Sequence, residues 1–217
     1  MVEPFETVAA RPPQEPIETR IFLASRNAKK LAEMERILGE AMPGVTVLGL
    51  DDVVAYAEPV EDQPDFDGNA LLKARAGHRA TGLPTVADDS GLCVDALNGM
   101  PGVLSARWSG QPKDDDRNNR LLLEQLADVP DERRGAHFTC SVAFVHDGGE
   151  LVVQGRMDGR VIREVRGSGG FGYDVVFEAD EHPGVTTAEL TREDKDAISH
   201  RGKALRELAP LVAAALS

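Results

Sequence analysis

Residues 20–38 have the sequence RIFLASRNAKKLAEMERIL, and two kinds of hydrophobic spacing within them decide the fold. The apolar run of residues 20–24 predicts a strand, whereas the leucines, methionine and isoleucine of residues 28–38 recur at helical spacing. Residues 25–27 form the turn between them. Such a turn directs free backbone N–H groups at a bound anion, and phosphate is a natural occupant. The alternative interpretation is that Ser25 or Asn27 only caps the helix.

The rest of the chain continues this alternation of strands and helices. Hydrophobic periodicity predicts further strands at 45–50, 85–87, 92–95, 137–146, 151–165 and 173–178, and helices at 68–81, 114–127 and 202–216. Residues 146–149, His-Asp-Gly-Gly, are typical of a hairpin connection. We therefore expect an α/β fold with a mixed sheet that contains one antiparallel section.

Length and composition limit the organisation of the chain. Residues 1–18 carry four prolines without hydrophobic periodicity, which predicts a flexible N-terminal extension. With 217 residues and 41% hydrophobic content, the chain suffices for one sizeable core, so we expect residues 19–217 to form a single domain.

The net charge and the cysteine content limit the kinds of binding partner and the cellular compartment that we expect. The net charge of −13 argues against a nucleic-acid partner, but it is compatible with a small anion held by a local pocket and a metal. Two isolated cysteines, Cys93 and Cys140, suit a reducing compartment and no zinc site. No apolar run is long enough to span a bilayer, so we expect a cytoplasmic protein without a membrane partner.

Adjacent carboxylates make residues 88–91, Asp-Asp-Ser-Gly, a candidate metal site. One aspartate at a strand end can ligate a hard cation such as Mg²⁺ while its neighbour orients water. The acidic stretch 58–67, which includes Glu61, could supply another ligand. The alternative is that the paired aspartates only form a turn and that the acidic stretch is solvated surface.

Two further polar groups stand near predicted helices. Asn69 and Lys73 are four residues apart, so they share a helix face and could both reach a phosphate; exposed helix residues are the alternative. Lys195 and the segment Ser199-His200-Arg201 precede the last helix, where positive charge opposes the helix dipole, which indicates an anionic or acceptor-rich ligand. A solvated basic patch explains this last group equally well.

Residues 167–172 contain a formal GxGxxG pattern, but its context excludes a dinucleotide-binding fingerprint. That fingerprint needs a helix immediately afterwards, whereas residues 173–178 are strand-like. Glycines around Phe171 indicate instead a close backbone approach to a flat ligand on which the phenyl ring can stack.

Together, five segments resemble the Ham1 family of inosine/xanthosine triphosphate pyrophosphatases over nearly all of residues 20–217. In the family's order, they are ASRNAKKLAEM from Ala24, FDGNALLKARA from Phe66, VADDSGLCVDALNGMPGVLSARWSG from Val86, GSGGFGYDVVF from Gly167 and KDAISHRGKAL from Lys195. The resemblance implies an elongated mixed α/β sheet with flanking helices, two lobes around a central substrate groove, and a homodimer. This architecture is also similar to that of the Maf-type pyrophosphatases.

The resemblance also implies a role for each matched residue. Glu61 and Asp89 would hold Mg²⁺, aided by Asp88, and Asp89 would also accept a proton from the attacking water. The nucleoside triphosphate substrate would be contacted by Ser25, Asn27, Lys30, Asn69, Lys73 and Ser90 toward its phosphates, and by Phe171, Gly172, Tyr173, Asp174, Lys195, His200 and Arg201 around its base. Donors from His200 and Arg201 would favour the six-position oxygen of hypoxanthine and xanthine over the amino group of adenine.

Two residues depart from the family pattern, and two alternative functions remain. Arg26 stands where the family usually has glycine, and Val175 replaces the proline that usually follows the Gly-Tyr-Asp triplet. A Maf-type pyrophosphatase acting on other modified nucleotides is one alternative, against which the SHR and FGYD segments argue. A non-catalytic nucleotide-binding protein is the other, and the intact Asp88-Asp89 pair argues against it.

Overall fold

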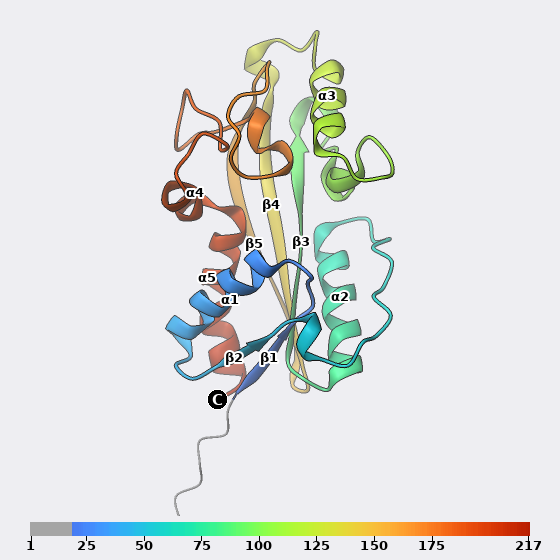
Figure 1. Cartoon of the computed structure of the whole chain (residues 1–217), viewed down its shortest axis with the longest axis vertical. Helices are drawn as coiled ribbons and strands as arrows, with labels where there is room; N and C mark the ends of the chain where they lie inside the picture. The colour runs from blue at the N-terminus through green and yellow to red at the C-terminus, as the bar shows by residue number, and fades with distance from the viewer. Residues whose placement is uncertain (1–18) are drawn as a thin grey trace, which may run out of the picture.

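A computed structural model describes residues 19–217, and a single six-stranded sheet runs through them (Figure 1). The flexible extension predicted for residues 1–18 lies outside the described residues. The strand order is β2-β1-β3-β4-β5-β6. The strands are β1 (Arg20–Leu23), β2 (Thr46–Leu48), β3 (Thr85–Val94), β4 (Gly135–His146), β5 (Gly149–Val161) and β6 (Phe177–Ala179).

Pairing directions confirm the mixed sheet. β1 runs parallel to both β2 and β3, while β3, β4, β5 and β6 are joined by antiparallel ladders. β1 ends at Leu23, which pairs with Val86, so the pairing of β3 with β1 stops just before Asp88. Beyond that point one edge of β3 borders the middle of the molecule (Figure 1).

The helices cover both faces of the sheet. They are α1 (Ala28–Ala41), α2 (Phe66–Thr81), α3 (Asp115–Gln125), α4 (Arg192–Ile198) and α5 (His200–Ala215). Because strand residues alternate in direction, neighbouring residues of β3 enter different cores. Val86 packs with α1 and α5, whereas Ala87 packs with Ala70 and Ala74 of α2. α2 therefore lies on one face of the sheet, with α1 and α5 on the other.

Separate apolar clusters at the two ends of the long strands produce two lobes. The lower end is packed by residues of α1, α2 and α5 against β1, β3 and β4. At the upper end, Leu92 and Val94 of β3 pack with Leu122 of α3 and with Leu126, which directly follows that helix. Phe177 of β6 belongs to the same cluster. The two lobes and the elongated shape agree with the expected fold (Figure 1).

Three secondary-structure predictions were wrong. Residues 88–91 are not a strand end but the middle of β3, because the ladder to β4 continues without a break from Thr85 to Val94. Residues 172–176 form a 3₁₀ turn rather than a strand, and only Phe177–Ala179 pairs with β5. The pattern also failed to predict α4, a helix of seven residues capped by Thr191.

Within residues 19–217, none of the helices has the combination of length and apolar character that spanning a bilayer requires.

Candidate active site

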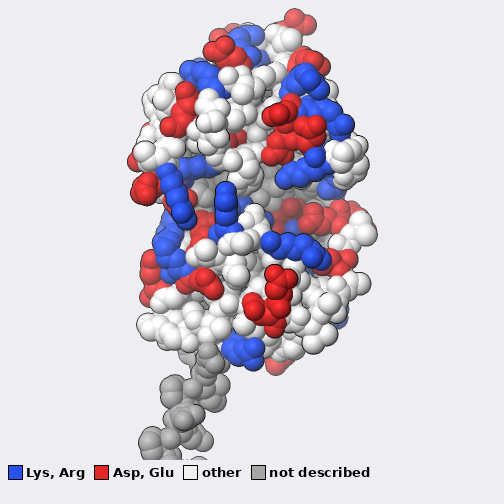
Figure 2. All heavy atoms as spheres, viewed as in Figure 1, with Lys and Arg blue, Asp and Glu red and all other residues white. Residues whose placement is uncertain are grey.

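A cavity of about 570 Å³ lies between the two lobes. Figure 2 shows it as a hollow at mid-height, with Lys and Arg side chains gathered around it. Its walls come from α1, the middle of β3 and β4, the segment before α3, residues 169–174, and α4 with the start of α5. Eight of the predicted substrate residues line it, namely Ser90, Phe171, Gly172, Tyr173, Asp174, Lys195, His200 and Arg201.

Next to Ser90, two carboxylates from separate segments meet at one ammonium group. Lys73 of α2 donates to Glu61 Oε1 at 2.6 Å, and its Nζ lies 3.9 Å from Asp89 Oδ1. Asn69, one helical turn earlier, donates to Asp89 Oδ2 at 2.9 Å. The predicted i,i+4 face of α2 therefore exists, and it is directed at carboxylates rather than at solvent.

The environment of Asp89 favours a proton-accepting role. Burial raises the pKa of its carboxyl group above the usual value, and the nearby Lys73 and the Asn69 hydrogen bond offset part of that rise. A carboxylate whose pKa is raised is a better base once it is ionised. Asp89 is thus held in place by α2 and keeps a basicity above that of an exposed aspartate.

Asp88 occupies a different environment from Asp89, although the resemblance implies that it aids the same metal. Lys30 Nζ of α1 contacts its two oxygens at 2.8 and 2.6 Å, and Arg201 Nε of α5 lies 3.4 Å from Oδ2. Burial alone would raise the pKa of Asp88, but these two cations more than offset it and hold the pKa well below its usual range. Because α1 and α5 cover the face opposite α2, Asp88 points away from Glu61.

The turn before α1 has the geometry of a helix cap. Asn27 Oδ1 accepts from the backbone N–H groups of Lys29 and Lys30, and Ser25 Oγ accepts from the N–H of Asn27. The capping interpretation of Asn27 is therefore correct, and phosphate binding by this turn remains a prediction. Arg26 pairs with Glu58, a residue of the loop that also carries Glu61.

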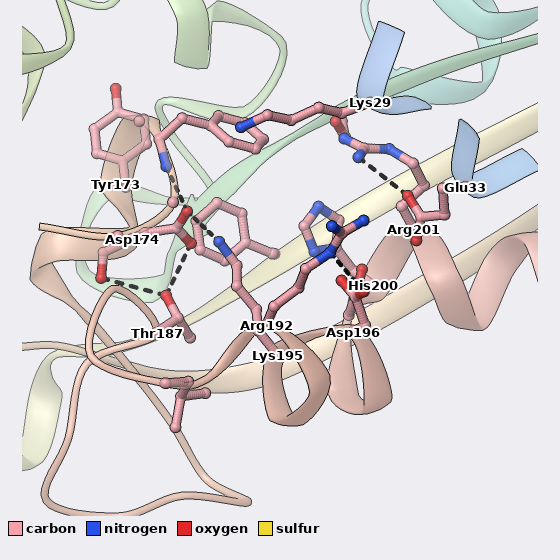
Figure 3. Close-up of a pocket in the computed structure, with 18 of the residues that line it drawn as sticks. Lys29, Glu33, Tyr173, Asp174, Thr187, Arg192, Lys195, Asp196, His200 and Arg201 are labelled. Atoms are coloured by element: carbon pink, nitrogen blue, oxygen red, sulfur yellow. Dashed lines mark hydrogen bonds and ion pairs between the residues drawn. The ribbon is translucent and has the colours of Figure 1, made fainter. Parts of the chain in front are cut away.

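At the upper end of the cavity, Asp174 organises the segment around Phe171. Its buried carboxylate accepts from the backbone N–H of Phe171 at 2.8 Å, from Thr187 Oγ1 at 2.8 Å, and from Lys195 Nζ (Figure 3). Gly170 has a φ of +75° and leaves no space for a side chain beside Asp174 and Lys195. Phe171 is 54% exposed and lines the cavity, with Lys195 Nζ 5.4 Å from the centre of its ring.

His200 lies in the cavity wall, with its ring stacked on Phe138 at a centroid separation of 5.1 Å. Burial, assisted by neighbouring Arg201, lowers the pKa of His200 to about 3, so the imidazole is neutral at neutral pH. Within residues 19–217, its buried Nδ1 atom has no hydrogen-bond partner. Such a group is an uncommon feature of a folded protein and is consistent with a ligand that completes the hydrogen bond.

Several residues that line the cavity were not predicted from the sequence as site residues. The additional charged groups are Lys29, Glu33, Arg36, Lys113, Asp115, Arg192 and Asp196, and the additional wall residues include Phe138 and Thr187. Helical spacing places Lys29, Glu33 and Arg36 on one face of α1, which was the available signal. Lys113 and Arg192 lie in segments for which the sequence offered no pattern.

A sheet with helices on both faces, a cavity of nucleotide size at the edge of β3, and carboxylates and cations arranged about it define an α/β enzyme that acts on a small anionic ligand. The Ham1 family profile matches residues 21–211. The chain belongs to the Ham1 family.

Curated and solved relatives agree with this assignment. A protein of Nocardia farcinica named dITP/XTP pyrophosphatase is 60% identical over 197 residues, which cover 90% of this chain and 95% of that protein. The crystal structure of a nucleoside-triphosphatase, or dITP/XTP pyrophosphatase, from Mycobacterium abscessus is 54% identical, with a TM-score of 0.75, and covers 88% of this chain and 100% of that one. The structure of the Ham1 protein of Staphylococcus aureus is 33% identical, with a TM-score of 0.83, and the match covers 91% of this chain and 100% of that one.

Proposed function

We propose that this protein hydrolyses the non-standard purine nucleotides dITP, ITP and XTP to their monophosphates and pyrophosphate, which removes deaminated purines from the nucleotide pool. The observation that carries the proposal is the meeting of Glu61 and Asp89 at Lys73, beside a cavity that His200 also lines. The relatives' names, dITP/XTP pyrophosphatase, support the activity on dITP and XTP.

We assign Mg²⁺ as the cofactor, with Glu61 and Asp89 as its protein ligands. Among the described residues, no three histidine, cysteine or carboxylate side chains come together as a metal-binding group. Two carboxylates nevertheless suit Mg²⁺, which is usually bound through one or two carboxylates together with waters and substrate phosphates. When bound, the ion would neutralise charge on the phosphoryl oxygens. Asp88 is not included, because Lys30 contacts both of its oxygens.

The side chains around the carboxylates suit an attack of water on the α-phosphorus. The water oxygen bonds to that phosphorus, the bond to the bridging α–β oxygen breaks, pyrophosphate leaves, and Asp89 accepts the proton of the water. Lys73 and Lys30 stabilise the charge that develops on the phosphoryl oxygens. Asn69 holds the Asp89 carboxylate in position, while Ser25, Asn27 and Ser90 contact the substrate nearby.

The upper part of the cavity suits recognition of the base. Phe171 would stack on the purine, and the backbone of residues 171–174, with Asp174 and Lys195, would enclose it. His200 and Arg201 would donate to the six-position oxygen of hypoxanthine or xanthine. Adenine carries a donor at that position and would leave them unpaired, which discriminates by roughly 10⁴-fold in sites of this type.

A panel of nucleotides tests the proposed activity. The purified protein with Mg²⁺ should release pyrophosphate from ITP, dITP and XTP with a kcat/KM at least about 10²-fold above that for ATP or GTP. Guanine carries the same six-position oxygen, so its exclusion would come from crowding near its two-position amino group rather than from His200 and Arg201. Pyrophosphate is measured by a coupled assay, and the monophosphate product by chromatography. Equal rates on all five nucleotides would refute the selectivity, and release of single phosphates would refute the position of cleavage.

Asp89→Asn should lower kcat for ITP by about 10²–10⁴-fold, the range typical of a lost general base. The variant should fold normally, because the amide can still accept a hydrogen bond from Asn69. Asp62→Asn is the matched control, since Asp62 is an exposed carboxylate next to Glu61. Retained activity of Asp89→Asn, with the control unchanged, would show that Asp89 is neither base nor metal ligand.

We also propose a homodimer, a cytoplasmic location, a single domain over residues 19–217, and no nucleic-acid or membrane partner. The dimer and location follow from the family resemblance and from the two free cysteines, respectively. Light scattering of the purified protein should give twice the chain mass of 23.4 kDa, and a monomer would refute the assembly.

A further inference from the structure

Asp88 lies at the centre of a nearly buried network of four charges from three elements. Its side chain is 5% exposed and contacts Lys30 of α1 and Arg201 of α5. Arg201 Nη1 in turn lies 3.6 Å from Glu33 Oε2, one turn after Lys30 on α1 (Figure 3). Lys30, Arg201 and Glu33 are 19%, 12% and 17% exposed, respectively. Two positive and two negative groups balance within this network.

The two cations of the network belong to different parts of the proposed site. Lys30 lies in the first turn of α1, beside the turn proposed to bind phosphate. Arg201 lines the cavity and follows His200, which is proposed to donate to the base. The Asp88 carboxylate accepts from both cations. A single carboxylate thus joins the phosphate end to the base end.

Because the network is nearly buried, the pairing of Asp88 with Lys30 and Arg201 depends strongly on the charge of Asp88. Removing the Asp88 charge leaves two partly desolvated cations facing each other, and uncompensated buried charge is strongly unfavourable. A lysine ammonium on a flexible stem then loses its fixed position, and the guanidinium of Arg201 keeps only the longer contact to Glu33. Both ends of the site would lose their alignment from one substitution.

We propose that Asp88 is a positioning residue that sets Lys30 and Arg201 together and thereby couples phosphate alignment to recognition of the purine. This inference rests on the proposed function. It assigns Asp88 no contact with the metal and none with the substrate.

The test compares Asp88→Asn with the wild-type protein in the presence of Mg²⁺. Three quantities separate the parts of the site: the Kd for inosine by calorimetry reports the base end, kcat for ITP reports phosphate alignment, and the Mg²⁺ concentration at half-maximal rate reports the metal. We expect the Kd for inosine to rise about tenfold and kcat for ITP to fall about tenfold, which is the size of a lost charge-assisted hydrogen bond. The Mg²⁺ concentration at half-maximal rate should change less than about twofold, because the proposed metal ligands Glu61 and Asp89 are unaltered.

Glu178→Gln is the matched control. Glu178 is also a nearly buried carboxylate in the sheet, 8% exposed, and it contacts the two cations Arg160 and Arg166, away from the cavity. Its loss should lower thermal stability without changing the Kd for inosine. Calorimetric stoichiometry gives the folded fraction of each variant, so a loss of folded protein is separated from a loss of alignment.

A rise in the Mg²⁺ requirement of Asp88→Asn with an unchanged Kd for inosine would overturn the proposal in favour of a metal ligand. Should Asp88→Asn fail to fold, Lys30→Met decides, since Lys30 touches Asp88 but does not line the cavity. Weaker inosine binding by Lys30→Met supports the coupling, and an unchanged Kd overturns it. Failure of the proposed function is distinct, because it would appear in the wild-type protein as no release of pyrophosphate from ITP.

Discussion

Burial keeps the His200 imidazole neutral, and this gives the protein a pH-dependent stability. Burial and the nearby Arg201 lower the pKa of His200 to about 3, whereas an unfolded histidine has a pKa of about 6.5. Between these two values the unfolded chain binds a proton that the native protein does not. The His200 contribution is therefore present above about pH 6.5 and is lost as the pH falls toward 3, by at most about 1.4 kcal/mol per pH unit.

Chemical unfolding at several pH values measures this contribution. The free energy of unfolding should fall from pH 7 to pH 4, and the fall should be shallower in His200→Gln. Carboxylates titrate over the same interval, so the difference between wild type and variant isolates the histidine. His182→Gln, which does not line the cavity, serves as the control. Equal pH slopes for wild type and His200→Gln would contradict a buried neutral imidazole.

At the residue scale, the sequence predicted which side chains gather around the cavity better than it predicted what each one does. Asp88 and Asp89 are chemically identical and adjacent, so their sequence context placed both of them at one metal site. The alternation of a strand sends them to opposite faces, toward Lys30 and toward Lys73, respectively. The residues around an aspartate in the sequence do not reveal which lysine or arginine of a distant helix it contacts. These contacts give Asp88 and Asp89 their different environments.

At the scale of elements, close packing of α5 on β5 positions the residues proposed to bind the base. A Cβ atom added at Gly155 of β5 would meet the carbonyl oxygen of His200 and lie 2.6 Å from the backbone nitrogen of Ala204. Backbone atoms cannot move aside as a flexible side chain can. Glycine at this position therefore lets the start of α5 rest directly on the sheet, which fixes His200 and Arg201 against the cavity.

Gly155→Ala should displace the start of α5 and weaken both stability and selectivity. We expect a loss of about 1–3 kcal/mol in the free energy of unfolding, typical of overpacking, and a fall in the ratio of kcat/KM for ITP over ATP. Gly39→Ala in α1 is the control, because no atom lies within 4 Å of its added Cβ. That substitution should be neutral or stabilise by up to about 1 kcal/mol. An unaffected selectivity in Gly155→Ala would show that α5 does not depend on this contact.

The elements themselves could be predicted where periodicity was long and regular. α1, α2, β4 and most of β5 follow from their spacing, and the mixed sheet follows from their order. β3 was misjudged at residues 88–91 because Asp, Ser and Gly are typical of turns. The unbroken ladder to β4 overrides that local preference, and Gly91 is required there because Gly102 and Ser105 occupy the space of a side chain. Such tertiary constraints cannot be read from local composition.

At the scale of the whole molecule, the charge of the cavity opposes the charge of the chain. The protein carries a net charge of −13, yet the residues that line the cavity include six Lys or Arg and four Asp or Glu. A nucleoside triphosphate therefore meets repulsion from the distant surface and attraction from the cavity. Which effect dominates depends on the distance over which charges act.

Ionic strength should consequently change the rate of substrate capture in two opposite directions. The screening length is about 30 Å at 0.01 M salt, so an approaching substrate responds to the whole acidic surface, but only about 10 Å at 0.1 M, where the cations of the cavity dominate. We expect kcat/KM for ITP at constant free Mg²⁺ to rise between these concentrations and to fall at higher salt. A continuous fall from the lowest ionic strength would contradict the repulsion.

The cavity cations can be tested separately from the acidic surface. Lys113→Gln and Lys29→Gln should each lower kcat/KM for ITP about two- to fivefold at 0.1 M salt with kcat unchanged, because they act on approach rather than on the reacting phosphate. Arg163→Gln removes a positive charge outside the cavity, where the side chain pairs with Asp131, and should have no such effect. Equal losses in all three variants would mean that net charge, and not its placement at the cavity, governs capture of the nucleotide.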